Sequence, residues 1–256
     1  MAAPQGWRQA VTTLLELKSL DKRFGGLYVT RAVSFALHAG DRMALIGPNG
    51  AGKTTLVNQI SGVLAADTGE IWLRGNDVTR MSQAQRVRAG LARTFQITTL
   101  APHFAVQRQI ELALFEREGL TGGMWRSVDA YPSLQEEAQE ILSRFGLRAH
   151  AAVATEDLAY GDQRLIEMAL ALALRPKVLL LDEPMAGVPK GDGKHLLAAL
   201  DALPRDLAVL IIEHDMDLVF RFANRIVVLA EGAVLADGSP EQIRCDPKVR
   251  AAYLGN

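Results

Sequence analysis

The stretch GPNGAGKTT, from Gly47 to Thr55, constrains the fold of this chain more than any other feature. It fits the pattern G-x-x-x-x-G-K-[ST], and it lies between the apolar segment MALI and the segment LVNQI. Glycines let the main chain adopt angles closed to other residues and approach an oxyanion closely. A strand, such a loop and a helix start together cradle phosphate, because successive N–H groups and the helix N-terminus attract anions. The sequence therefore predicts an α/β nucleotide-binding core.

The side chains of this loop have separate expected roles. Lys53 is expected to reach the β- and γ-phosphates, the Thr54 hydroxyl to bind Mg²⁺, and Thr55 to donate to a nearer phosphate. A glycine-rich turn without a ligand is the alternative, and the flanking strand and helix make it improbable. The predicted nucleotide-binding residues of the loop are Gly47, Pro48, Asn49, Gly50, Ala51, Gly52, Lys53, Thr54 and Thr55.

Acidic residues and a histidine follow two apolar strands far downstream. In VLLLDEP, Asp182 is expected to hold the Mg²⁺ shell, and Glu183 is the candidate base that orients an attacking water. In LIIEHD, His214 leaves the second strand where its ring could contact the γ-phosphate and Glu183. Ligands gather at the carboxyl ends of strands in open α/β sheets. An isolated acid after a strand commonly caps a helix or faces solvent, so this prediction depends on the loop upstream.

Composition excludes several classes of protein. The net charge of −1 gives no general attraction to nucleic acid, so we expect no nucleic-acid partner. The lone Cys245 cannot form an internal disulfide, which is typical of a reducing compartment. No run approaches the roughly 20 apolar residues of a transmembrane helix. We therefore expect a soluble chain that can still dock on a membrane protein.

The order of these motifs resembles that of the nucleotide-binding subunits of ATP-binding cassette (ABC) transporters. ARTFQITTL resembles the family's Q-loop, in which Gln96 would sense Mg²⁺ and the attacking water. LAYGD, from Leu158 to Asp162, stands where the family signature reads L-S-G-G-Q, and its Gly161 would contact ATP held by another cassette. Phe24, in DKRFGG, stands where the family places an aromatic residue against adenine. We find no N-K-x-D stretch, which disfavours a GTPase.

This resemblance, with the strand and helix patterns, predicts one ABC ATPase domain over residues 1–256. Short strands with turns are expected over residues 14–45 and in GEIWLRGNDV, helices over residues 82–174, and a hairpin in RIVVLAEGAVLADG. The fold class is α/β: a P-loop NTPase core with a mostly parallel sheet flanked by helices, an N-terminal antiparallel β subdomain and an inserted α-helical subdomain. The core would span about residues 10–95 and 165–256, and the helical subdomain about 96–164.

A narrower resemblance is to the ATPase subunits of branched-chain amino-acid importers, in particular the larger of the pair. It is carried by KRFGGL, the A-Y-G signature, the insert from Thr98 to Glu156, EHDMDLVF and the ending AYLGN. The ATPase of lipopolysaccharide export shares several of these traits. The resemblance implies that ATP and Mg²⁺ are bound and that Glu183, His214 and Gln96 serve hydrolysis.

The same resemblance implies partners and a location. They are transmembrane permease subunits, docked near ITTLAPHF, a second ABC ATPase subunit, identical or paralogous, and a periplasmic solute-binding protein. The chain would be cytoplasmic and peripheral on the inner face of the membrane. A soluble ABC-type ATPase of translation or DNA repair is one alternative, and a module that binds nucleotide without hydrolysing it is another.

Three residues depart from the family pattern. Ala159 lacks the serine hydroxyl, Asp162 adds negative charge where glutamine is usual, and Pro189 replaces an Asp or Asn. We therefore hypothesise that this chain's own ATP site hydrolyses well only when a partner brings a better signature.

Overall fold

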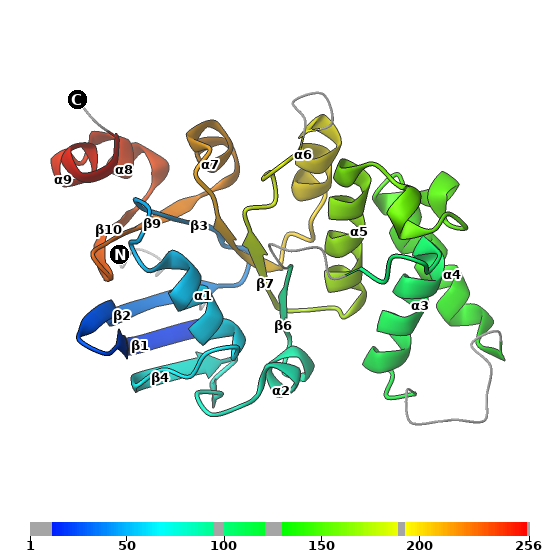
Figure 1. The fold of residues 1–256 in the computed structure, drawn as a ribbon, viewed down its shortest axis with the longest axis horizontal. Coiled ribbons are helices and arrows are strands. Elements are labelled where there is room, and N and C mark those ends of the chain that lie inside the picture. Colours follow the sequence, from blue (N-terminus) through cyan, green and yellow to red (C-terminus); the bar gives the residue numbers. More distant parts are fainter. Residues whose placement is uncertain (1–11, 95–99, 121–129, 189–192, 255–256) are drawn as a thin grey trace, which may run out of the picture.

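The computed structural model describes residues 12–94, 100–120, 130–188 and 193–254 (Figure 1). Strands and helices alternate through most of this range. The strands are β1 (Thr13–Phe24), β2 (Leu27–His38), β3 (Arg42–Ile46), β4 (Thr68–Leu73), β5 (Asn76–Asp77), β6 (Leu91–Arg93), β7 (Val178–Asp182), β8 (Ala208–Ile212), β9 (Arg225–Ala230) and β10 (Ala233–Gly238). The α-helices are α1 (Lys53–Ser61), α2 (Gln83–Arg88), α3 (Val106–Arg117), α4 (Pro132–Arg144), α5 (Tyr160–Ala173), α6 (Gly193–Asp201), α7 (Met216–Phe222), α8 (Pro240–Cys245) and α9 (Pro247–Val249).

The larger sheet has the strand order β10-β9-β3-β8-β7-β6. Its neighbours from β9 to β6 run parallel, and β10 pairs with β9 as the predicted antiparallel hairpin. On β8, Val209 and Ile211 pack in one buried cluster, while Ala208 and Leu210 pack in another. Because successive side chains point to opposite faces, both faces of this sheet are buried. That explains why the strands read as continuous apolar runs.

The smaller sheet is antiparallel, in the order β2-β1-β4-β5. Leu15 and Leu17 of β1 share a buried cluster with Leu56 of α1 and Leu45 of β3. This sheet therefore covers one face of the larger sheet through α1, which confirms the predicted N-terminal antiparallel unit.

Helices α3, α4 and α5 gather at the end of the molecule away from the smaller sheet (Figure 1). Gly146 follows α4 with a φ of 71°, as the C-terminal glycine of a helix does. Five apolar residues at helical spacing in and just after α4 are all buried: Leu134, Ala138, Ile141, Leu142 and Phe145. The division of the chain at about residues 96 and 164 stays a prediction, and α5 runs across the second of these positions without a break.

One strand lies where the sequence predicts helix. Residues Leu91–Arg93 form β6 and pair in parallel with β7, with Leu91 opposite Val178. Three residues are too few to show a strand period, so long-range pairing decides their conformation. In the part of the chain described, every helix is too short or too polar to cross a lipid bilayer.

Candidate nucleotide-binding site

Three of the predicted site segments leave the larger sheet at one edge. Strands β3, β8 and β7 are adjacent and parallel, with Leu45 opposite Ile212 and Ile212 opposite Asp182. The loop after β3, the acids at the end of β7 and His214 after β8 therefore emerge together. This is the edge at which open α/β sheets bind ligands.

Two glycines of the loop, Gly47 and Gly52, are required by close packing as well as by the loop conformation. Gly47 has a φ of 152°, and a Cβ there would lie 2.1 Å from the carbonyl oxygen of Leu229 on β9. Gly52 has a φ of 98°, and a Cβ there would lie 2.3 Å from the carbonyl oxygen of Val29 on β2. Neighbouring strands thus fix both ends of the loop, so that only glycine fits.

Helix α1 begins at Lys53 without a side-chain cap and without an acidic residue in its first turn. Its first N–H groups and its positive end are therefore available to an anion. The Lys53 ammonium donates to the carbonyl oxygens of Gly47 (2.6 Å) and Pro48 (3.0 Å). Burial lowers the pKa of Lys53, and the nearby Glu183 carboxylate partly offsets that shift. The loop and helix start fit a bound polyphosphate.

Asp182 is almost fully buried at the end of β7, with 3% of its side chain exposed. Its Oδ2 accepts a hydrogen bond of 2.6 Å from the Arg93 guanidinium, which also donates to Asn58 Oδ1 and Ser61 Oγ on α1. The carboxylate of Asp182 and the hydroxyl of Thr54, an exposed residue, are hard oxygen donors of the kind Mg²⁺ prefers. The donor set therefore fits a magnesium ion between α1 and β7.

Glu183 lies at the turn that leaves β7. Its φ of 47° is in the left-handed region, which strains a residue other than glycine, and its N–H donates to the Ile212 carbonyl on β8. Its carboxylate is 28% exposed, and Oε1 lies 4.0 Å from Nδ1 of His214, whose own side chain is 67% exposed. The carboxylate and the imidazole thus face one space beside the loop.

Glu213 was not predicted, although it belongs to this edge. It is 1% exposed, and its carboxylate accepts from the N–H groups of Met185, His214 and Asp215. The Glu213 carboxylate therefore connects the loop after Glu183 to the loop that carries His214 through hydrogen bonds. An acid directly before a strand-end histidine was the available signal, but the partner Met185, 28 residues away, cannot be read from a sequence.

The signature segment lies elsewhere. Ala159 caps α5 and Gly161 is buried in its first turn. Both border a cavity of about 480 Å³ whose walls come from α4, α5 and α6, and no residue of the loop Gly47–Thr55 lines it. Within one chain the signature therefore does not complete the nucleotide site.

Three further residues singled out in the sequence are Phe24, Gln96 and Pro189. Phe24 ends β1 with 52% of its surface exposed, so its ring is accessible. Gln96 and Pro189 lie outside the described residues. The roles assigned to all the predicted site residues stay predictions.

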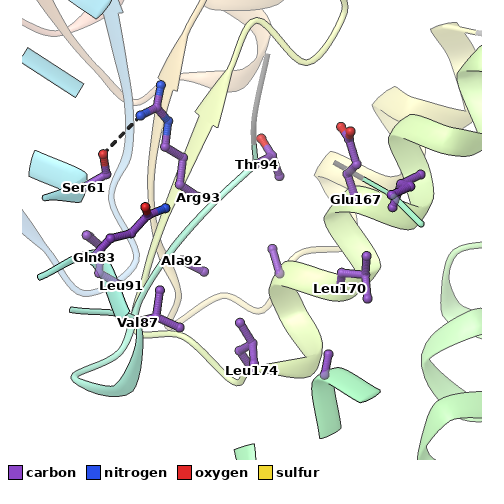
Figure 2. Close-up of a pocket in the computed structure, with 13 residues that line it drawn as sticks. Ser61, Gln83, Val87, Leu91, Ala92, Arg93, Thr94, Glu167, Leu170 and Leu174 are labelled. Atoms are coloured by element: carbon purple, nitrogen blue, oxygen red, sulfur yellow. Dashed lines mark hydrogen bonds between the residues drawn. The ribbon is translucent and has the colours of Figure 1, made fainter. Parts of the chain in front are cut away.

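A cleft lies where β6 and α2 face α5 and α3 (Figure 2). It has a volume of about 220 Å³, and its walls are mainly apolar: Val87, Leu91, Leu170 and Leu174. Arg93 and Glu167 lie on opposite sides of it, and the Arg93 guanidinium points toward Ser61 of α1 (Figure 2).

Comparison with known proteins agrees with this geometry. A model of the ABC transporter family matches residues 30–186, and a model described as a branched-chain amino acid ATP-binding cassette transporter matches residues 233–256. The chain belongs to the ABC transporter family. This ABC cassette therefore binds ATP and hydrolyses it to power transport.

Relatives of the cassette are similar over nearly the whole chain. The high-affinity branched-chain amino acid transport ATP-binding protein LivG of Escherichia coli K12 is 38% identical over 251 residues, which cover 94% of this chain and 98% of LivG. The corresponding protein BraF of Pseudomonas aeruginosa gives the same identity and coverage. The ADP conformation of MJ1267, an ATP-binding cassette of an ABC transporter, superposes with a TM-score of 0.80 at 29% identity, covering 95% of this chain and 99% of the other.

Proposed function

We propose that this cassette cleaves Mg²⁺-bound ATP at the loop Gly47–Thr55 and powers the import of branched-chain or related amino acids. The observation that carries the proposal is the meeting of Lys53, Asp182, Glu183 and His214 at one edge of the sheet. The solute class is supported by the names of the relatives and by the family model at the C-terminal end.

The side chains divide the chemistry among themselves. Lys53 and the N–H groups at the start of α1 would hold the phosphates, and Phe24 would stack on adenine. Mg²⁺, held by the Thr54 hydroxyl and the Asp182 carboxylate, would neutralise charge on the phosphate oxygens when bound. Glu183 would accept the proton of the attacking water, and His214, 4.0 Å from it, would orient the γ-phosphate. Gln96 would sense Mg²⁺ and the attacking water in the same site.

The signature would act on a nucleotide held by a second cassette. Within the chain it lies apart from the loop, so Gly161 and the start of α5 would close over the phosphates of an identical or paralogous subunit. Closure of two cassettes would exclude water from the reacting phosphate.

A permease subunit would dock at the cleft between β6 and α5. The walls of this cleft are mainly apolar, and Leu100, which belongs to the predicted docking stretch ITTLAPHF, lines it. The cassette would lie at the cytoplasmic face of the membrane through this contact, in a complex fed by a periplasmic solute-binding protein. A cysteine cross-link from Val87 to the permease in a working transporter would support this contact, and cross-linking from the opposite end of the sheet alone would refute it.

The decisive experiment replaces Glu183 by Gln in the assembled transporter. Removing the base should slow phosphate release by about 10²–10⁴-fold and stop amino-acid uptake, while ATP binding persists. Glu231→Gln is the matched control, since Glu231 also has a positive φ, of 48°, but lies in the turn between β9 and β10. Unchanged hydrolysis in Glu183→Gln would reject the assignment of the base. Hydrolysis that never supports amino-acid uptake would reject the solute class.

A further inference from the structure

Arg93 stands at the meeting point of three elements. It is the last residue of β6 and lies opposite Leu180 of β7, so its side chain can reach Asp182 at the end of that strand. Only 8% of its side chain is exposed. In Figure 2 its guanidinium extends from the wall of the cleft toward α1.

The guanidinium connects the helix after the phosphate loop to the magnesium carboxylate. One nitrogen, Nη1, donates to Asn58 Oδ1 (2.7 Å) and Ser61 Oγ (3.1 Å), both on α1. The other, Nη2, donates to Asp182 Oδ2 (2.6 Å). Within the described residues the second oxygen of Asp182, Oδ1, accepts no hydrogen bond, so it remains available to a metal or its bound water.

We propose that Arg93 is a positioning residue for magnesium: it holds one oxygen of Asp182 against α1 and so presents the other to the ion. The inference rests on the proposed Mg²⁺-dependent ATP site. Arg93 itself would not touch the nucleotide.

Arginine suits this task better than lysine. Its planar fork offers donors in fixed directions, so it can join two elements at once, whereas a lysine ammonium is a flexible point charge. Arg93 also places positive charge near the ion, which by itself would weaken magnesium binding. The two effects have opposite signs, and the proposal requires that positioning exceeds repulsion.

The experiment titrates Mg²⁺ into the full chain mixed with a fluorescent ATP analogue and records the midpoint of the metal-dependent change. Mn²⁺ in place of Mg²⁺, followed by electron paramagnetic resonance, reports the metal directly. The variants are Arg93→Lys, which keeps the charge, and Arg93→Met, which removes it. Both should raise the metal midpoint about tenfold, since outer-shell partners typically change metal affinity by 10–100-fold. Binding of the analogue in EDTA should stay unchanged.

Arg86→Lys is the matched control. Arg86 is also buried against the end of α1, but it donates only to carbonyl oxygens, among them those of Gln59 and Thr79. Arg86→Lys should lower the stability of the fold and leave the midpoint of the metal titration unchanged. If the Arg93 variants fold poorly, Asn58→Ala removes one anchor on α1 without touching Asp182, and it should raise the midpoint by a smaller factor.

The outcomes separate this inference from the proposed function. An unchanged midpoint in the variants, or a lower midpoint in Arg93→Met, overturns the role of Arg93 while the ATP site stands. A wild-type chain whose binding of the analogue ignores Mg²⁺ would contradict the proposed site itself.

Discussion

Two helix starts in this chain are expected to face phosphate, and they are built differently. Helix α1 begins at Lys53 with a glycine cap and no acid in its first turn. Helix α5 begins at Tyr160 in the signature, capped by Ala159, which has no side-chain hydrogen bond, and it carries Asp162 in its first turn. An acid at that position stabilises a helix by complementing its dipole, and for the same reason it lessens the attraction for an anion.

The surroundings of the two helix starts sharpen the contrast. Beside α1, Asp182 accepts one hydrogen bond from Arg93, and Glu213 accepts three from backbone N–H groups. The Glu183 carboxylate lies close enough to Lys53 to oppose the lowering of the lysine pKa by burial. Beside α5, the Tyr160 hydroxyl is held by Arg164 of the same helix. The difference is the basis for the hypothesis that the chain's own ATP site, the cis site, is better built than its contribution to a partner's site.

The largest effect is expected at the start of α1. Lys53→Ala should weaken ATP binding by at least about 100-fold, because each hydrogen bond to a charged group is worth about 1.5–3 kcal/mol and two are lost. Calorimetric titration with ATP and Mg²⁺ measures this loss. Lys177→Ala is the control, since Lys177 is a half-exposed lysine whose carboxylate partner, Asp206, is 3.8 Å away at the surface. Equal affinities for the two variants would show that the loop does not hold the phosphates.

The contrast between local and long-range information explains what the sequence could predict. The loop, the acids after β7 and His214 were predictable because each follows an apolar strand within a few residues. Arg93 was not, since its partner Asp182 is 89 residues away and β6 is too short to show a period. The close approach of Leu229 to Gly47 and of Val29 to Gly52 could not be predicted either, because these residues are far apart in the sequence.

The fold likewise has features that local sequence patterns predict and features that depend on long-range contacts. Both faces of the larger sheet and the apolar face of α4 follow from residue patterns alone, whereas the order of strands in the sheet depends on contacts between distant segments. The family resemblance predicted a mostly parallel sheet with an antiparallel β subdomain, because it carries information from whole structures that periodicity lacks, but it did not predict the order of the strands.

A smaller effect is expected at the start of α5. The double change Ala159→Ser and Asp162→Gln adds a hydroxyl donor and removes a negative charge, so it should strengthen ATP-driven dimerisation about tenfold, the equivalent of one hydrogen bond to a charged group. ATP binding to the isolated chain should not change. Sedimentation of the Glu183→Gln chain with and without the double change measures the dimerisation constant.

Asp157→Asn is the control for the double change. It removes the same charge from an exposed residue just before the signature, outside α5. Dimerisation that rises equally in this control would attribute the gain to net charge. Dimerisation that stays constant in both would mean that the departures at Ala159 and Asp162 do not weaken the signature.

The smallest effect concerns the pH dependence of the cis site. Burial raises the pKa of Glu213 above its usual value of 4.5, although the N–H groups of Met185, His214 and Asp215 and the charge of His214 oppose the shift. An acid with a raised pKa contributes stability that is fully present below its unfolded pKa and is lost as the pH rises through its folded pKa. Glu213→Gln lacks that dependence. The free energy of unfolding of the variant, measured relative to wild type by urea titration, should therefore increase from acidic to neutral pH.

The sign of that slope is the test, because the amide of Glu213→Gln also faces backbone N–H groups and lowers stability equally at every pH. Glu241→Gln supplies the opposite case. Hydrogen bonds from its own backbone N–H and from Ser239 lower the pKa of the exposed Glu241, so this variant should lose stability relative to wild type as the pH rises. Parallel slopes in the two variants would mean that burial does not govern Glu213, and that the cis site holds this carboxylate ionised without a cost in stability.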